Sequence, residues 1–299
     1  MAPTQYIAPV TDSTAIFRQD LFKSKVLFCT GGGSGICKAM TEAIMRHGAN
    51  AVIVGRKLER LTESATQLSK ATGSQCIAAQ ADVRQPSQLK DAVAKTIEKF
   101  GRIDFVICGA AGNFLASIDG MSENAFKTVM EIDTLGTFNT VKATLPHIRA
   151  SHGSYIHVSA TLHWKGTPYQ VHVSAAKAGV DALSAVLAVE EGPRGVRSNV
   201  IAPGPIGETE GMSRLSAYPK EGGEKKEVQA NSRYPLGRIG NLKDVANAAV
   251  FFFSPAAENI SGQVIAIDGA FEHLRSFQLP YPQALLDPES IKHMIKPRL

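Results

Sequence analysis

The first residues that could do chemistry form a glycine-rich stretch at 30–37, with the sequence TGGGSGIC. An apolar run at 25–29 predicts a strand before it, and the apolar spacing of 38–47 predicts a helix after it. Glycine lets the backbone approach phosphate oxygens, and a helix start offers free N–H groups and a positive dipole end. We therefore predict a phosphate-binding loop, against the alternative of a plain tight turn, made by Gly31, Gly32, Gly33, Ser34, Gly35 and Ile36.

Further candidate residues follow later apolar runs of the chain. They are Arg56 and Lys57 after the second run, Asp82 and Val83 after the third, residues 109–112 after the fourth and 203–205 after the sixth. The carboxyl ends of parallel strands meet at one edge of a sheet, where doubly wound folds bind their ligands. The common position of these residues predicts a dinucleotide site at that edge.

The residue after the second strand distinguishes the two nicotinamide cofactors. A carboxylate at this place binds the free ribose hydroxyls of NAD, whereas this chain has Arg56 and Lys57. Their positive charge suits the 2′-phosphate of NADPH, so NADPH is the predicted cofactor. The alternative is a solvated basic pair at the start of a helix.

The elements that must position these residues alternate between strands and helices. The predicted strands lie at 25–30, 50–54, 75–80, 103–108, 154–159, 196–201 and 262–267, and the helices at 35–47, 57–71, 86–99, 122–149, 169–191 and 241–252. This alternation predicts an α/β fold, a single Rossmann-like doubly wound parallel β-sheet flanked by helices on both faces. We expect one domain over 1–299, with an N-terminal arm at 1–24, a substrate-lid segment at 205–236 and a C-terminal tail at 271–299.

The composition of the 299 residues is that of a soluble globular protein, with 44% hydrophobic and 20% charged residues. The basic residues are scattered, which argues against a nucleic-acid partner, and the net charge of +5 suits anionic ligands such as nucleotides. Four cysteines without a C-x-x-C pair predict neither a metal site nor a disulfide framework. The chain shows no signal-peptide layout and no apolar run of membrane-spanning length, so we expect an intracellular protein without a membrane span.

These residues closely resemble the pattern of the short-chain dehydrogenase/reductase family over nearly the whole chain. The matching positions are Thr30, Gly31, Gly35, Asp82, Val83, Ala110, Ala111, Gly112, Lys177, Asn199, Pro203, Gly204, Asp268 and Gly269. For the cofactor, the resemblance implies contacts from Lys177, which binds the nicotinamide ribose in the family, and from Ala110, Ala111, Gly112, Pro203, Gly204, Pro205, Ile206 and Thr209.

Four positions depart from the family pattern. Cys37 stands where the family has its last loop glycine, and Asp133 replaces the helix asparagine. Val173 and Ala160 stand where family members that reduce carbonyls have a tyrosine and a serine. Reducing a ketone requires a positioned acid that protonates the oxygen, and valine cannot donate a proton. Ordinary alcohol–ketone chemistry is therefore not expected.

The same losses resemble the peroxisomal 2,4-dienoyl-CoA reductases within this family. The stretches that carry this resemblance lie at 20–25, 110–115, 129–134, 170–177 and 203–211. It implies hydride delivery from NADPH to the far end of a dienoyl thioester and protonation of the dienolate on carbon to 3-enoyl-CoA, in β-oxidation of unsaturated fatty acids. Asp133 and Lys177 are then the catalytic residues, which hold the water that supplies the proton. The alternatives are a helix cap for Asp133 and a solvated side chain for Lys177.

By the same resemblance, the acyl-CoA site is lined by Phe114, Ser122, Asn124 and Arg214. The nearby His157, His163 and His172 are interpreted as structural or solvated, because no partner for them is evident. Tyr169 precedes Lys177 by eight residues, more than two helical turns, so it does not replace the missing tyrosine.

The resemblance also predicts partners and a location. The helices at 122–149 and 169–191 form the usual association surface of the family, which predicts a homodimer or homotetramer. The last residues, Pro297, Arg298 and Leu299, match in part a peroxisomal address of the Ser-Lys-Leu type. A peroxisomal import receptor is therefore an expected partner and the peroxisomal matrix the expected location, with the cytoplasm as the alternative.

Two other functions stay open at this point. One is another NADPH-dependent enoyl or carbonyl reductase of the same fold. The other is a non-catalytic NADP-binding protein, since a dead enzyme would also lack the serine and the tyrosine. Val173 and Ala160 argue against a carbonyl reductase, and the retained Lys177 argues against a dead enzyme.

Overall fold

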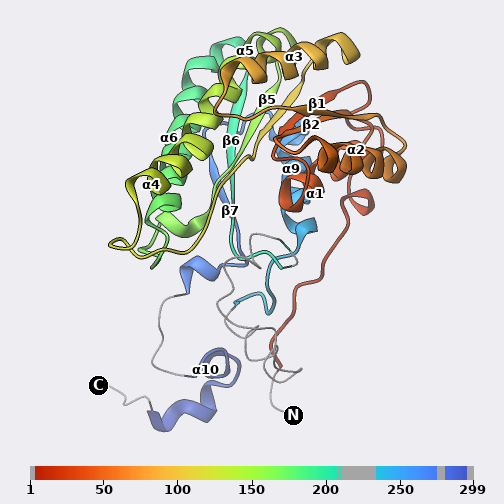
Figure 1. Ribbon diagram of the computed structural model, residues 1–299. Coiled ribbons are helices and arrows are strands. Elements are labelled where there is room, and N and C mark those ends of the chain that lie inside the picture. Colours follow the sequence, from red (N-terminus) through yellow and green to blue (C-terminus); the bar gives the residue numbers. More distant parts are fainter. Residues whose placement is uncertain (1–3, 208, 210–233, 275–279, 295–299) are drawn as a thin grey trace.

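Seven parallel strands form one sheet in the order β3-β2-β1-β4-β5-β6-β7 (Figure 1). The computed structural model describes residues 4–207, 209, 234–274 and 280–294. The strands are β1 (Val26–Thr30), β2 (Asn50–Gly55), β3 (Cys76–Gln80), β4 (Phe105–Cys108), β5 (Ser154–Val158), β6 (Arg197–Pro203) and β7 (Val264–Ile267). Each predicted strand is present, with bounds that differ by a few residues. The strand order changes direction between β1 and β4, which is the switch point where such sheets bind ligands.

Helices cover both faces of the sheet, which confirms the predicted fold class (Figure 1). One face carries α1 (Gly35–Arg46), α2 (Leu58–Thr72) and α9 (Leu242–Phe253), and the other carries α3 (Pro86–Phe100), α5 (Gly136–Ser151) and α6 (Val171–Glu191). Because both faces are covered, β1 is buried along its whole length. This explains why its sequence is a continuous apolar run without alternation.

The predicted helix at 122–149 is wrong in one respect. The chain forms α4 (Glu123–Met130), then a π-helical turn at Glu131–Leu135, and then α5, which ends at Ser151. A π turn accommodates one extra residue within a helical path, and such turns recur at functional sites. Asp133 lies in the middle of this turn and is fully buried.

The described part of the N-terminal arm lies against α9 and the segment that precedes it. The Ala8 amide donates a hydrogen bond to the Leu236 carbonyl (3.1 Å), and Lys243 pairs with Asp12 (3.0 Å). The proposed lid at 205–236 falls mostly outside the described residues. The C-terminal tail includes α10 (Gln283–Leu286), which stands apart from the sheet in Figure 1.

One helix is more apolar than the sequence analysis expected. By length and composition alone, Val171–Arg194 could cross a membrane, contrary to the expectation that no run approaches that length. This segment contains α6, which buries Val180 and Leu187 against the sheet and carries Lys177. A core helix of a sheet layer has the same composition, and 39% of this apolar window is buried, so the composition alone does not indicate a membrane span.

Candidate active site

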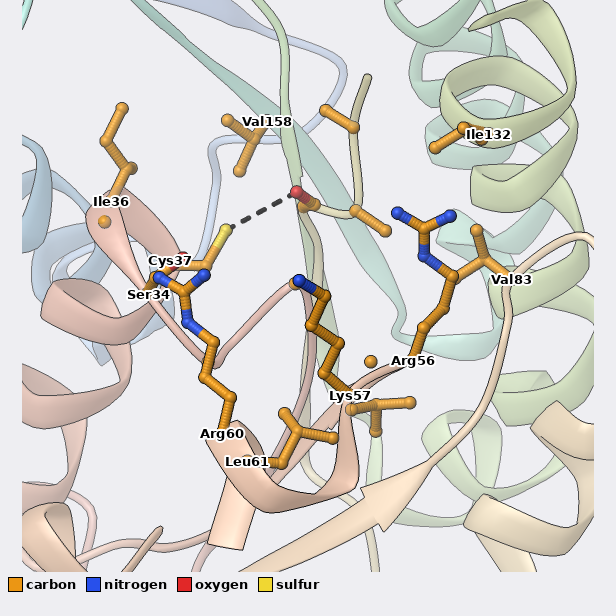
Figure 2. Close-up of a pocket in the computed structure, with 18 of the residues that line it drawn as sticks. Ser34, Ile36, Cys37, Arg56, Lys57, Arg60, Leu61, Val83, Ile132 and Val158 are labelled. Atoms are coloured by element: carbon orange, nitrogen blue, oxygen red, sulfur yellow. Dashed lines mark hydrogen bonds between the residues drawn. The ribbon is translucent and has the colours of Figure 1, made fainter. Parts of the chain in front are cut away.

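A pocket of about 460 Å³ opens at the carboxyl ends of the central strands (Figure 2). Twelve of the residues predicted to bind the cofactor line it: Gly31, Gly33, Ser34, Gly35, Ile36, Arg56, Lys57, Asp82, Val83, Ala110, Ala111 and Thr209. The pocket therefore brings together residues from five separate segments, those that follow β1, β2, β3, β4 and β6, as the common position of the strand ends predicted.

The glycine loop fits tightly between the ends of β2 and β4. Gly31 has φ +73°, and a Cβ atom there would lie 2.7 Å from the Gly109 carbonyl oxygen. A Cβ atom on Gly32 would meet Ile53 at 2.6 Å, so Gly32 packs on β2 and does not line the pocket. Glycine is thus required at both positions by the close approach of neighbouring chain segments.

The start of α1 faces the pocket. Ser34 is the N-cap residue, yet its side chain makes no capping hydrogen bond. The first-turn N–H groups of a helix have no partner within the helix, and together with the helix dipole they bind anions. This arrangement fits the pyrophosphate of a dinucleotide cofactor.

Cys37 lies on the first turn of α1 and lines the same pocket. Its thiol lies 3.7 Å from the Gly109 carbonyl oxygen, a contact drawn in Figure 2. This side chain is not among the residues predicted to bind the cofactor. A hydrogen bond with Cys29 lowers the pKa of the Cys37 thiol, assisted by the charge of Lys177, while burial opposes the shift.

Three basic side chains form one rim of the pocket. Figure 2 shows Arg56, Lys57 and Arg60 extending in the same direction from the end of β2 and the start of α2, with Lys57 between the two arginines. Sequence reasoning missed Arg60, although its spacing of four residues from Arg56 would place both on one side of a helical first turn. Asp82 is the one acid among the described pocket residues, and hydrogen bonds from Arg84 (2.6 Å to Nη2) lower the pKa of its carboxyl group. The rim therefore favours a phosphate group over free ribose hydroxyls.

Asp133 and Lys177 meet directly. The Lys177 ammonium lies 3.1 Å from Asp133 Oδ2, with side-chain exposures of 7% and 0%. Asp133 Oδ1 accepts a hydrogen bond from the Gly112 amide (2.8 Å), and Lys177 donates one to the Val158 carbonyl (2.8 Å). A buried carboxylate–ammonium pair fixed at both ends can hold a water and move a proton without changing its own net charge. Gly112 and Lys177 were both predicted to bind the cofactor. In the structure they contact Asp133 and are not among the pocket-lining residues.

The positions of the absent tyrosine and serine contain no proton donor. Val173 is 3% exposed and packs with Val129 and Ala176 in a small apolar cluster. Ala160 is the residue before the turn Thr161–His163. The neighbouring Ser159 hydroxyl is buried and has no hydrogen-bond partner in the described part of the chain. The acid of a carbonyl reductase has no counterpart at either position.

Three of the residues predicted to bind acyl-CoA, Phe114, Ser122 and Asn124, lie in the loop after β4 or at the start of α4. Phe114 is 36% exposed, and its ring stacks on His172. Ser122 is the N-cap of α4 and accepts a hydrogen bond from the Ala125 amide, and both Ser122 and Asn124 are exposed. Arg214 lies outside the described residues. Of the three that the structure describes, Phe114 is the one linked to the Asp133 region, through its stack on His172.

The residues at and after the end of β6 that were predicted to bind the cofactor do not all lie in the pocket. The Gly204 amide donates to the Ile267 carbonyl (3.1 Å), and Pro205 accepts from Gly240 (3.1 Å). Ile206 is 2% exposed and pairs with Gly240 in an isolated parallel bridge. Residues 203–206 are therefore bonded to the neighbouring chain and are not among the pocket-lining residues, whereas Thr209 lines the pocket.

Two of the three histidines have partners that the sequence analysis did not foresee. His157 Nε2 lies 3.0 Å from the Ser198 hydroxyl, and burial lowers the pKa of His157 to about 3. His163 Nε2 lies 2.7 Å from Asp181 Oδ2. Both pairs support the structural interpretation, since neither ring lines the pocket.

Comparison with known proteins identifies the family. The sequence model described as Enoyl-(Acyl carrier protein) reductase matches residues 31–272. The chain belongs to the short-chain dehydrogenase/reductase family. It is 49% identical over 275 residues, 90% of this chain and 92% of the relative, to the peroxisomal 2,4-dienoyl-CoA reductase SPS19 [(3E)-enoyl-CoA-producing] of Saccharomyces cerevisiae.

Two further similarities support the same membership. A peroxisomal 2,4-dienoyl-CoA reductase of Danio rerio is 46% identical, with 86% of this chain and 84% of the relative covered. Among solved structures, carveol dehydrogenase from Mycobacterium avium in complex with NAD superimposes with a TM-score of 0.77 at 25% identity, covering 85% of this chain and all of that one. Membership in this family implies that the pocket holds a nicotinamide dinucleotide.

Proposed function

We propose that this chain is an NADPH-dependent 2,4-dienoyl-CoA reductase of the peroxisome, which forms 3-enoyl-CoA. Nearly full-length identity of 49% to a yeast enzyme of that name supports the substrate class and the product. The basic rim of the pocket supports NADPH over NADH. The chain would thus act in the β-oxidation of unsaturated fatty acids.

The pair Asp133–Lys177 is the observation that carries the proposal. It is buried at 3.1 Å beside positions where a carbonyl reductase would have its acids, and where this chain has Val173 and Ala160. Such a site has no acid to protonate an alkoxide. It retains a group that can deliver a proton through a water to a carbon atom.

The proposed chemistry separates hydride and proton in space. When bound, NADPH would supply the hydride for the far end of the conjugated dienoyl thioester, whose electrons would then be taken up toward the thioester oxygen. Asp133 holds a water, and the Lys177 ammonium orients it and stabilises negative charge nearby. The water then protonates the dienolate on carbon, and one proton from solvent restores it. The net reaction consumes one dienoyl-CoA, one NADPH and one proton.

For the cofactor, the residues fit an anionic dinucleotide at three places. The first-turn amides of α1 would bind the pyrophosphate, and Arg56, Lys57 and Arg60 would bind the 2′-phosphate. Lys177 would also reach the nicotinamide ribose, as the family resemblance implies. These contacts are the basis for proposing NADPH.

The direct test is the oxidation of NADPH by the purified protein, followed by absorbance, with three substrate classes. We expect turnover with a 2,4-dienoyl-CoA and none with a ketone or a saturated acyl-CoA. A 2-enoyl-CoA should be at least about a hundredfold poorer. Mass spectrometry and chromatography should identify the product as 3-enoyl-CoA. Turnover of ketones alone, or of no thioester, would refute the proposal in favour of a carbonyl reductase or a non-catalytic NADP-binding protein.

The peroxisomal location has its own test. We propose that residues 297–299 are read by a peroxisomal import receptor, although Pro297 departs from the usual tripeptide. The last dozen residues fused to a fluorescent reporter should give punctate signal that coincides with a peroxisomal marker. A diffuse signal would show that this segment does not direct import.

A further inference from the structure

His172 lies in the first turn of α6 and is completely buried. Its ring stacks on the ring of Phe114, with centroids 4.2 Å apart and an interplanar angle of 25°. The loop that carries Phe114 is also tied to the start of α6, because the Ala116 amide donates to the Tyr169 carbonyl (3.2 Å). The stack therefore joins the loop after β4 to the helix that carries Lys177.

An imidazole is a costly residue for this place. Neither ring nitrogen makes a hydrogen bond of good geometry to the residues that the structure describes. Burying a polar group without a partner is unfavourable, and a leucine or phenylalanine would fill the same space without that cost. Burial lowers the pKa of His172, so the ring is neutral near pH 7. A weak hydrogen bond with the Phe114 backbone and the charge of the Asp133 carboxylate oppose this shift, and both link the ring to its neighbours. The question is therefore why this position has a neutral, flat imidazole ring against Phe114.

Phe114 has one covered and one free side. His172 covers one face of its ring, and 36% of the residue stays exposed. Phe114 follows Gly112 by two residues, and the Gly112 amide is bonded to Asp133. The charge of Asp133 also acts on the His172 ring, so the aromatic stack lies close to the Asp133 carboxylate.

We propose that His172 is a positioning residue for the substrate. It holds the Phe114 ring in one orientation, so that the exposed face stacks on the planar conjugated dienoyl group. Aromatic pairs prefer such offset stacking, and a flat diene matches it better than a flexible saturated chain does. The His172–Phe114 stack thereby selects conjugated thioesters. This inference rests on the proposed dienoyl-CoA reductase activity.

Two substitutions separate the flat ring from its volume. His172→Leu keeps the volume and removes the flat face, whereas His172→Phe keeps the face and removes both nitrogens. For His172→Leu we expect KM for dienoyl-CoA to rise about tenfold, with kcat changed less than about twofold and an unchanged NADPH dissociation constant. His172→Phe should keep KM within about twofold of the wild type. The inhibition constant of a saturated acyl-CoA of equal length should change less than about twofold in both variants.

A double-mutant cycle tests whether His172 acts through Phe114. Phe114→Leu should raise KM about as much as His172→Leu, and the double variant should be no worse than Phe114→Leu alone. His147→Ala, on α5 away from the pocket, is the matched control and should leave KM and kcat unchanged. If His172→Leu does not fold, His172→Gln replaces it in the same cycle.

The outcomes distinguish the inference from the proposed function. A wild-type protein without dienoyl-CoA turnover refutes the function. With turnover present, additive effects of His172→Leu and Phe114→Leu, or an equal loss in His172→Phe and His172→Leu, overturn the positioning role. A selective rise of KM that is rescued by phenylalanine and absent from the Phe114→Leu background supports it.

Discussion

At the scale of single residues, the proposed chemistry depends on Asp133 and Lys177, because the tyrosine and serine of carbonyl reductases are absent. Asp133 would carry negative charge into a site that must also accommodate an enolate, which is unfavourable unless a cation is fixed nearby. Lys177 supplies that cation at 3.1 Å, and the Gly112 amide fixes the other carboxylate oxygen. The pair is therefore close to neutral, and a water bound to it can lose a proton to carbon and regain one from solvent.

Replacing Asp133 by asparagine tests this assignment. Asparagine keeps the size of the side chain but carries no charge to hold the proton-donating water or to balance Lys177, so kcat should fall at least about a hundredfold. The NADPH dissociation constant, measured by fluorescence titration, should change less than about threefold. Glu191→Gln removes another buried carboxylate, paired with Arg149 at the far end of α6, and should lower stability without lowering kcat. Normal turnover by Asp133→Asn would contradict the catalytic role of Asp133.

Arg56 is the residue for which cofactor choice is predicted. Arg56→Ala removes a charge that we place against the 2′-phosphate, so KM for NADPH should rise about 10- to 100-fold. NADH has no 2′-phosphate, and its KM should stay nearly constant, which gives an internal control. Steady-state kinetics with both cofactors measure the ratio. Lys70→Ala, an exposed substitution at the other end of α2, should leave both values unchanged. Equal changes for NADPH and NADH in Arg56→Ala would contradict the 2′-phosphate contact.

At the scale of elements, the widened turn between α4 and α5 places Asp133. Gly136 begins α5 directly after it, and a Cβ atom there would lie 2.5 Å from Val83 Cγ2. In an ordinary helix, alanine is about 1 kcal/mol more favourable than glycine. Here the added methyl group must displace Val83 or the turn that holds Asp133.

We therefore expect Gly136→Ala to destabilise the protein by about 1–3 kcal/mol, opposite to helix propensity. The same variant should lose activity, because the turn that carries Asp133 shifts. Val83→Ala removes the clashing methyl groups and should restore stability in part. Gly166→Ala, in an exposed segment with open space around an added Cβ, should be neutral or stabilising. Thermal unfolding of Gly136→Ala, of its combination with Val83→Ala and of the control, each against the wild type, checks the order, and a stabilised Gly136→Ala would contradict it.

The start of α9 provides a prediction on pH. Asp244 is partly buried, which by itself raises the pKa of its carboxyl group. Hydrogen bonds from Arg238 and from the Asn241 amide together outweigh this effect, so the pKa lies below 3.8. The folded protein thus keeps this carboxylate ionised where the unfolded chain protonates it. Its contribution to stability is present above pH 3.8 and is lost as the pH falls through the folded-state pKa.

Asp244→Asn should therefore lower the free energy of unfolding by about 1–2 kcal/mol at neutral pH. The difference from the wild type should shrink on acidification below pH 3.8, because the wild type then loses the same interaction. Denaturant unfolding at several pH values measures this convergence. Glu289→Gln, in an exposed pair with Lys292, should show no pH-dependent difference. A constant gap for Asp244→Asn at all pH values would contradict the prediction.

At the scale of the whole molecule, sequence patterns predict the order of strands and helices along the chain. They do not predict which side chains of different elements come into contact. The parallel sheet follows from apolar runs separated by helical spacing. The turn at Glu131–Leu135 has the same apolar spacing as an ordinary helix, so periodicity could not reveal it. The contact of His172 with Phe114 depends on how the loop after β4 folds back on α6. Arg60 lines the pocket because of the way α2 is rotated about its axis relative to the sheet, and composition does not encode that rotation.

The outer surface of the molecule supports association with further copies of this chain, which we propose in agreement with the family resemblance. Phe138 on α5 is 47% exposed, and Val186 and Val189 on α6 are 56% and 78% exposed. Both helices cover the same face of the sheet (Figure 1). Apolar side chains that project from neighbouring helices lower the free energy when a second copy covers them.

A charged residue on this face should prevent that association. We expect the wild type to be a dimer or tetramer by light scattering coupled to size-exclusion chromatography, and Phe138→Asp with Val189→Asp to be a monomer. Leu58→Asp is the matched control, because Leu58 is 45% exposed on α2 at the opposite face and should leave the mass unchanged. Since association stabilises the folded state by mass action, the wild-type melting temperature should rise with protein concentration and that of the double variant should not. A wild-type monomer, or a double variant of unchanged mass, would exclude this face as the interface.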